Sequence, residues 1–160
     1  MTDDPSRIPP GFTYDTLEVG QRATSQGRTI TDTDITMYMM LTGGWHPVHC
    51  DREFMRRNGL GPVRAQGSMG IALSLGSHLE AGLVYSSEPF VRALGVDKWT
   101  YEKPLVAGDT IRLEVSIAEK ELLEDGKRYI VTRHARIVNQ NGELIQQGYA
   151  SSMWERAGAA

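Results

Sequence analysis

The chain has 160 residues, of which 40% are hydrophobic and 23% are charged, and this is the size and composition of one globular domain. Its formal net charge of −3 argues against a nucleic-acid binder, and its acidic, proline-containing start is unlike a signal peptide. The single cysteine, Cys50, excludes an internal disulfide and predicts a cytoplasmic location, and the longest mostly apolar stretch, Met69–Leu75, is too short to cross a membrane. We expect an N-terminal arm over residues 1–14, one domain over 15–156 and a flexible C-terminus over 157–160.

The first half of the chain has the pattern of short helices joined by loops. Residues 31–41 favour a helix, because Thr31 or Asp32 can cap its start and Gly43 and Gly44 can stop it. The other candidates in this half are a short strand over Thr16–Ala23, a short helix from Asp51 to Asn58–Gly59 and a helix over Gly67–Leu79.

The segment from Gly67 to Leu79 differs from the others because it has no polar face. Apolar residues occur all round it, and Gly67, Gly70 and Gly76 are spaced among them. A helix that is apolar on every side is a buried helix, and small residues let neighbouring backbone approach closely. We therefore predict that this helix is the central element of the core.

The second half of the chain is predicted to form antiparallel strands. One segment alternates apolar and polar residues with period two, and Asn139–Gly142 is a turn signal between two extended runs. The strand candidates are Lys98–Glu102, Thr110–Ala118, Arg128–Val138 and Glu143–Trp154. A buried helix followed by a hairpin-linked sheet indicates the α+β class, with an antiparallel sheet wrapped on one helix.

The densest cluster of polar residues lies between the two short helices, at residues 41–51. His46 and His49 are three positions apart, Pro47 stiffens the turn between them, and Asp51 follows two residues later. A neutral imidazole can take a proton from water or deliver one to a carbanion. The cluster therefore points to general acid–base chemistry, and the plainer alternative is a pair of histidines that only stabilises the loop.

This segment resembles the hydratase loop of MaoC-like (R)-specific enoyl-CoA hydratases. Residues 42–51 read Thr-Gly-Gly-Trp-His-Pro-Val-His-Cys-Asp, and the family loop reads Ser/Thr-Gly-Asp-x-Asn-Pro-aliphatic-His-x-Asp. The resemblance covers roughly residues 15–155 in order, with further matches at Arg28–Ile35, Gly61–Met69, Pro104–Ile111 and Asn139–Gly142. It implies a single hot-dog domain, in which an antiparallel sheet wraps around a long central helix, and a dimer with active sites at or near the subunit interface.

The departures from the family loop fall on its catalytic residues. The family activates water with an Asp and a His, and the resemblance places His49 at the His position. Gly44 stands at the Asp position and His46 at the Asn position. A positioned acid or base contributes ~10²–10⁴-fold to a rate, so the family mechanism cannot be assumed. We hypothesise that His46 and His49 form a substitute catalytic pair, with Asp51 or another carboxylate orienting one ring.

Four further residues are candidates for substrate binding. Gly67 and Ser68 place backbone N–H groups at the start of the central helix, where they can polarise a thioester carbonyl; alternatively, Gly67 only permits close packing. Trp45 can shorten the acyl pocket or stack on a flat acyl group, and Thr42 can close the preceding helix or contact substrate. Core packing is favoured over an acyl-chain pocket for the nearby methionines, which are Met37, Met39, Met40 and Met55.

As the resemblance implies, we expect an enoyl-CoA hydratase or dehydratase that adds water reversibly and syn to a trans-2-enoyl-CoA, and the missing carboxylate suggests an unusual substrate. One alternative is a hot-dog acyl-CoA thioesterase, for which Glu53 or Glu80 would supply a carboxylate. Another is a catalytically inactive subunit that binds acyl-CoA. The expected partners are the acyl-CoA thioester and a second copy of the chain, with no cofactor, no metal, no nucleic acid and no membrane.

Overall fold

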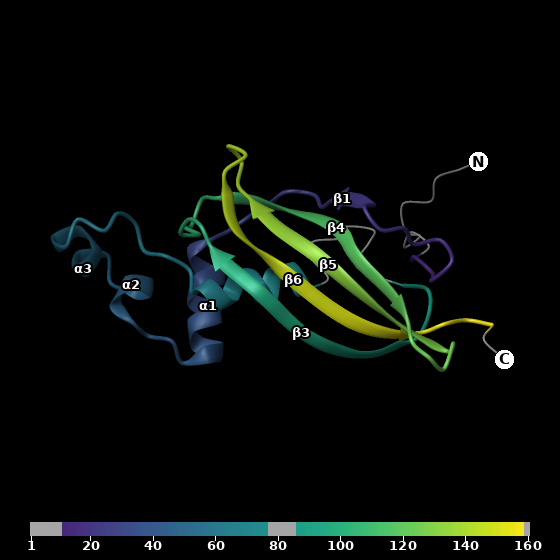
Figure 1. The fold of residues 1–160 in the computed structure, drawn as a ribbon. Helices are drawn as coiled ribbons and strands as arrows, with labels where there is room; N and C mark the ends of the chain where they lie inside the picture. Colours follow the sequence, from purple (N-terminus) through teal and green to yellow (C-terminus); the bar gives the residue numbers. More distant parts are fainter. Residues whose placement is uncertain (1–10, 77–85, 159–160) are drawn as a thin grey trace, which may run out of the picture.

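A six-stranded antiparallel sheet dominates the computed structural model, which describes residues 11–76 and 86–158 (Figure 1). The strands follow the order β1–β4–β5–β6–β3, and β2 also pairs with β4. The strands are β1 (Arg22–Thr24), β2 (Arg28–Thr29), β3 (Phe90–Tyr101), β4 (Thr110–Leu122), β5 (Arg128–Val138) and β6 (Leu144–Glu155). The helices are α1 (Asp32–Thr42), α2 (Pro47–Cys50), α3 (Arg52–Arg57) and α4 (Gly67–Leu75). The predicted α+β class is confirmed.

The core lies between one face of the sheet and the helices α1 and α4. Successive residues of a strand point to opposite faces, and in β5 and the first part of β4 every second residue is buried. Ile35 and Met39 of α1, and Met69 and Leu73 of α4, belong to the same buried cluster as the apolar residues of these strands. This cluster therefore holds both helices against the sheet.

α4 packs closely on the sheet, and a glycine makes this possible. A Cβ atom at Gly70 would lie 2.2 Å from the Oε1 atom of Gln146. The Gln146 side chain is only 2% exposed and accepts a hydrogen bond from Trp99 Nε1 at 3.0 Å, so it is held in place. The prediction that this helix is buried on every side is wrong, because Leu75, the last residue of α4, is 51% exposed. Residues 77–79 of the predicted helix lie outside the described part of the chain.

The helices α1, α2 and α3, here called the α1–α3 extension, lie at one end of the sheet, where α1 packs on the core and α2 and α3 project beyond it (Figure 1). Thr31 begins α1 as predicted, because its hydroxyl accepts the N–H of Asp34 while the Asp34 carboxylate accepts the N–H of Thr31. Gly43 ends α1 with φ of 70°. The short helix α2 was not predicted, and Pro47 stands at its first position, where proline is favoured.

The strand predicted over Thr16–Ala23 is wrong for most of its length, because β1 begins only at Arg22. The N–H of Thr13 donates to the Thr16 hydroxyl at 2.9 Å, and the N–H of Thr16 donates to the Thr13 hydroxyl at 3.2 Å. Such local bonds between side chain and backbone compete with strand pairing. Gly20, with φ of 89°, then turns the chain before β1.

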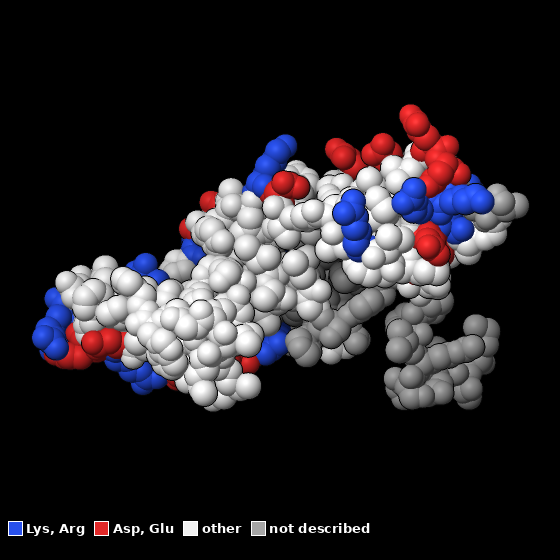
Figure 2. Space-filling model, turned by 90° about the horizontal axis from the view of Figure 1, so that it is seen from below, with Lys and Arg blue, Asp and Glu red and all other residues white. Residues whose placement is uncertain are grey.

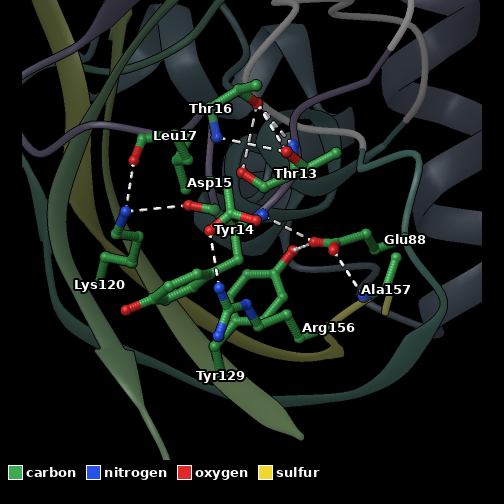
Figure 3. A network of polar contacts seen from close by, with 10 residues as sticks. All are labelled: Thr13, Tyr14, Asp15, Thr16, Leu17, Glu88, Lys120, Tyr129, Arg156 and Ala157. Atoms are coloured by element: carbon green, nitrogen blue, oxygen red, sulfur yellow. Dashed lines mark hydrogen bonds and ion pairs between the residues drawn. The ribbon is translucent and has the colours of Figure 1, made fainter. Parts of the chain in front are cut away.

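A buried carboxylate ties this N-terminal segment to the end of the sheet where β5 begins (Figure 3). Glu88 accepts hydrogen bonds from the N–H of Tyr14 at 2.7 Å, the hydroxyl of Tyr129 at 2.6 Å and the N–H of Ala157 at 2.7 Å. Burial, and then the bond to Glu88, raises the pKa of the Tyr129 hydroxyl, which therefore stays protonated and donates. The network lies opposite the α1–α3 extension and serves the fold.

β3 forms one edge of the sheet and is longer than predicted. The sequence indicated a strand over residues 98–102, whereas β3 spans 90–101. Within the described chain β3 pairs only with β6, and nearly all of its residues are exposed. The alternation that reveals a half-buried strand is therefore missing from its sequence. Large apolar residues are exposed along this edge, namely Phe90, Val91, Leu94, Val96 and Tyr101.

Candidate active site

His49 lies on α2, and backbone groups orient its imidazole. The Nδ1 atom is 2.7 Å from the carbonyl oxygen of Arg64, and the N–H of Arg64 donates to the carbonyl of Val48 at 3.0 Å. A carbonyl oxygen only accepts hydrogen bonds, so in the neutral ring Nδ1 carries the proton and Nε2 keeps its lone pair. The half-buried His49 ring is therefore set to act as a base at Nε2.

His46 precedes α2 and has the opposite arrangement. Its Nδ1 atom accepts the N–H of Val48 at 3.3 Å, as the cap of α2. In the neutral ring Nδ1 then holds the lone pair and Nε2 carries the proton. The centroids of the His46 and His49 rings are 6.3 Å apart, and the ring planes are inclined at 66°. The two histidines thus lie near one another, one with a free Nε2 lone pair and the other with an Nε2–H donor.

Neither imidazole is oriented by a carboxylate in residues 11–76 and 86–158, so the hypothesis for Asp51 is wrong. Asp51 instead caps α3 by accepting the N–H of Phe54 at 2.8 Å. Glu53 is exposed and forms an ion pair with Arg56 at 2.6 Å, and the Arg56 hydrogen bond lowers the pKa of the Glu53 carboxyl. Glu80, the other candidate carboxylate, lies outside the described residues.

The backbone at Gly44 is covered by the side chain of Gln66. A Cβ atom at Gly44 would lie 1.9 Å from Gln66 Nε2, and this Nε2 donates to the Gly44 carbonyl at 3.0 Å. Thr42 closes α1, since its hydroxyl lies 2.8 Å from the Tyr38 carbonyl, and it also contacts Gln66 Oε1 at 3.1 Å. Sequence reasoning missed Gln66 because it is 22 positions away from Gly44 and no local motif marks it.

The start of α4 adjoins this contact, because Gln66 is the residue that precedes the helix. The N–H groups of Gly67 and Ser68 belong to the first turn and have no hydrogen-bond partner in the described chain. A Cβ atom at Gly67 would lie 2.6 Å from the ring of Tyr101. Gly67 therefore permits close packing and also leaves its N–H available. Tyr101, which is 56% exposed, is a second neighbour of the site that the sequence did not reveal.

The apolar residues around the loop are divided between core and surface. Met39 and Met55 are buried, as core packing predicts. For Met37 and Met40 that prediction is wrong, because they are 64% and 68% exposed on the side of α1 that faces away from the sheet. Trp45, in the loop that follows α1, is 54% exposed, so large apolar side chains are exposed both on α1 and in this loop.

An apolar cavity of about 660 Å³ lies at the other end of α4, between that helix and the strands β3, β5 and β6. Its lining includes Leu75, Val96, Ala135 and Trp154, and none of the predicted site residues. In the described part of the chain no group of three or more His, Cys, Asp or Glu side chains is arranged to hold a metal ion. None of the described helices is long and apolar enough to cross a membrane.

Comparison with known proteins identifies the family to which this fold and its histidine loop belong. Residues 16–139 match the family model described as the MaoC like domain, and the chain belongs to this family. No curated protein matches the chain in sequence.

Solved structures share the fold over most of this chain. A monoamine oxidase regulatory protein from Archaeoglobus is 25% identical, with 92% of this chain and 97% of that chain covered and a TM-score of 0.81. An (R)-hydratase from A. caviae involved in PHA biosynthesis is 26% identical, with 86% and 96% covered and a TM-score of 0.66. A Mycobacterium tuberculosis protein with a double hot-dog fold is 14% identical, with 92% and 45% covered and a TM-score of 0.77. The predicted hot-dog fold is confirmed.

Proposed function

We propose that this protein is a hydro-lyase, which adds water to the α,β double bond of an enoyl-CoA thioester or removes it. The observation that carries the proposal is the pair of opposite hydrogen-bond partners, a carbonyl at His49 Nδ1 and an N–H at His46 Nδ1, in two rings whose centroids are 6.3 Å apart. Membership of the MaoC-like family and the likeness to an (R)-hydratase support the reaction class. The resemblance of the loop to enoyl-CoA hydratases supports a CoA thioester as substrate.

A single imidazole can carry the proton through the hydration step. His49 Nε2 takes a proton from water as the water oxygen bonds to the β-carbon, and the electron pair of the double bond moves through the α-carbon to the thioester oxygen. The His49 imidazolium then delivers that proton to the α-carbon as the carbonyl re-forms. Water oxygen and proton reach the same face, which gives the syn addition. The Nε2–H of His46 donates a hydrogen bond to the water oxygen and holds it beside His49.

The first turn of α4 stabilises the charge that develops in this step. The N–H groups of Gly67 and Ser68, which have no hydrogen-bond partner among residues 11–76 and 86–158, lie at the positive end of the helix dipole. Donors that are already in place when negative charge appears on the thioester oxygen lower the barrier without reorganisation. Gly67 and Ser68 are thus proposed as substrate-binding residues, with Thr42 and Trp45 as neighbours of the acyl group.

We further propose that the protein acts as a homodimer with its active sites near the subunit interface. Among the described residues only β6 pairs with β3, so the other side of β3 offers backbone groups to a second strand. A broad area without charged side chains crosses the middle of the molecule seen from below (Figure 2). Exposed apolar residues on α1 and in the loop after it also favour contact with a second copy of the chain. They are Met37, Met40, Leu41 and Trp45. A cytoplasmic location stays a prediction.

The proposal is tested by incubating the protein with trans-2-enoyl-CoA thioesters, including branched, aromatic and carboxylated ones, and following loss of the conjugated double bond. His46→Asn is the informative variant, because asparagine is a good cap for α2 and only the imidazole is lost. We expect turnover to fall by ~10²-fold or more. The matched control is His134→Asn on β5, whose ring stacks on Tyr149 at 4.8 Å and lies outside the loop.

Other outcomes of this experiment would change either the proposed mechanism or the proposed function. Unchanged turnover in His46→Asn would remove His46 from the mechanism. Release of free CoA without hydration would identify a thioesterase. Binding of acyl-CoA without any product would identify an inactive binding subunit.

A further inference from the structure

The carboxamide of Gln66 occupies the space in which a side chain at position 44 would lie. A Cβ atom on Gly44 would be 1.9 Å from Nε2, 2.6 Å from Cδ and 2.9 Å from Oε1 of Gln66, and real Cβ contacts are never that short. The backbone of Gly44 does not adopt a positive φ. A side chain at this position would therefore displace the Gln66 carboxamide, whereas the backbone conformation of Gly44 would permit one.

Hydrogen bonds fix the orientation of this carboxamide. The Gly44 carbonyl can only accept, so the atom that faces it at 3.0 Å is the donor Nε2. The opposite atom, Oε1, is 3.1 Å from the hydroxyl of Thr42, the last residue of α1. Gln66, the residue before α4, thus contacts both the end of α1 and the chain that leads into α2.

Every group of the proposed reaction is attached to one of the segments that Gln66 connects. His46 follows Gly44 by two residues. Arg64, whose carbonyl orients His49, precedes Gln66 by two residues. The N–H groups of the first turn of α4 follow Gln66 directly.

We propose that Gln66 is a positioning residue of the hydration site, whose carboxamide holds the histidine loop against the first turn of α4. The inference rests on the proposed function. The amide sets the separation between the imidazoles that handle the proton and the N–H groups that bind the thioester oxygen. A side chain at position 44 would have to displace the carboxamide, so the hydrogen bonds of Gln66 depend on glycine at that position.

The contact itself is tested by a double-mutant cycle on thermal stability. Gly44→Ala alone forces the amide out of its place, and we expect the Tm to fall by about 2–4 °C. In the Gln66→Ala background the same substitution meets open space and changes the Tm much less. Gly43→Ala is the matched control: Gly43 has φ of 70° and nothing within 4 Å, so its cost is the same in both backgrounds. Equal effects of Gly44→Ala in the two backgrounds would overturn the inference.

The positioning role is tested by kinetics and by side-chain nitrogen NMR of the histidines. We expect Gln66→Ala to lower kcat by ~10- to 100-fold, while KM changes by less than about threefold. The Glu side chain of Gln66→Glu has the same shape but cannot donate to the Gly44 carbonyl, so we expect the same loss of kcat. If Gln66 only filled space, Gln66→Glu would keep the wild-type kcat. Gln26→Ala, in the loop between β1 and β2, is the control with unchanged kinetics.

The NMR measurement separates this inference from the proposed function. In the wild type the His49 ring has one tautomer, with the proton on Nδ1, and in Gln66→Ala we expect tautomer averaging and faster exchange of that proton with water. If the wild type hydrates no enoyl thioester but the tautomer shift occurs, the proposed function fails and the positioning role stands. Unchanged histidine signals together with unchanged kcat would overturn the positioning role alone.

Discussion

The histidines of the loop acquire different chemical roles from uncharged backbone groups. The Arg64 carbonyl, at 2.7 Å, leaves His49 with a basic Nε2, and the Val48 N–H, at 3.3 Å, leaves His46 with an Nε2–H donor. A carboxylate in either place would stabilise the imidazolium instead of a neutral ring. Because a carbonyl only accepts hydrogen bonds and a backbone N–H only donates them, these partners determine which nitrogen of each neutral ring carries the proton.

The role of His49 is tested by replacing it with asparagine. The side-chain amide of asparagine can take the position of Nδ1 and keep the bond to the Arg64 carbonyl, while the atom corresponding to Nε2 is lost. We expect kcat for hydration to fall by ~10²–10⁴-fold with the Tm nearly unchanged, as measured by steady-state kinetics and thermal unfolding. A variant that keeps its kcat would show that the proton is handled elsewhere.

Close packing at Gly70 gives a residue-scale prediction for stability. Glycine to alanine inside a helix ordinarily stabilises a protein by about 1 kcal/mol. At Gly70 the added methyl group would lie 2.2 Å from the buried Gln146 amide, so we expect Gly70→Ala to lower the free energy of unfolding by about 1–3 kcal/mol. Denaturant unfolding measures the change. Ala72→Gly, at an exposed position of α4, is the control and follows helix propensity; a stabilised Gly70→Ala variant would contradict the packing.

At the scale of single elements, local chemistry determined what could be predicted. The start of α1 was predictable because the Thr31–Asp34 capping box and the stop at Gly43 are short-range signals. The hairpin between β5 and β6 was predictable for the same reason, since the Asn139 side chain accepts backbone N–H groups within its own turn. The bounds of β5, Arg128–Val138, agree with its alternating pattern.

The capping box of α1 predicts how stability depends on pH. Burial acts to raise the pKa of Asp34, but hydrogen bonds from Thr31 and the ion pair with Arg28 outweigh it, and the net pKa is lowered. A lowered native-state pKa means that this stabilisation is complete above the ordinary carboxyl pKa and is lost as the pH falls through the native value. We expect Asp34→Asn to reduce the free energy of unfolding by about 0.3–1 kcal/mol at pH 7.

The difference between wild type and Asp34→Asn should begin to shrink below the ordinary carboxyl pKa, where Asp34 of the unfolded chain becomes protonated, and should vanish below the lowered native pKa. Urea unfolding at a series of pH values measures it. A difference that stays constant down to the lowest pH would mean that the charge of Asp34 has no role in capping α1.

Elements that depend on distant contacts were not predictable from the sequence. β3 was predicted only at its end, because an edge strand that is exposed on both faces has no alternating pattern. α2 is four residues long and is held by the contact between Val48 and Arg64. Gln66 became a site residue only when the fold brought it onto Gly44. The two histidines were found because they are three positions apart in one loop.

For the whole molecule, apolar surface is exposed on the α1–α3 extension and along the edge strand β3 within residues 11–76 and 86–158. Exposed apolar residues occur on α1, on the loop before α2 and along β3. In a homodimer that joins the β3 edges, two sheets become continuous and the second copy covers part of this surface. The histidine loop belongs to the same region, so dimer formation and catalysis are expected to depend on one another.

Placing a charge on the β3 edge tests this arrangement. In Leu94→Glu, which changes a 37% exposed residue of β3, two like charges would meet across the twofold axis, and we expect the dimer Kd to rise by ~10-fold or more. Sedimentation velocity over a range of concentrations measures the change. Val19→Glu introduces the same charge at a 61% exposed residue outside β3 and should leave the dimer intact. Equal sedimentation of both variants and the wild type would exclude the β3 edge as the interface.

The central claim, that His49 and His46 direct water to the β-carbon of an enoyl thioester, is tested most directly with water labelled with oxygen-18. The protein is incubated with trans-2-enoyl-CoA in labelled water, and the products of the wild type and of His49→Asn are compared by fragmentation mass spectrometry. The account predicts one labelled oxygen at the β-carbon of an intact 3-hydroxyacyl-CoA, made by the wild type and almost absent with His49→Asn. Label in the carboxyl group of a released acid, or equal hydration by both proteins, would contradict it.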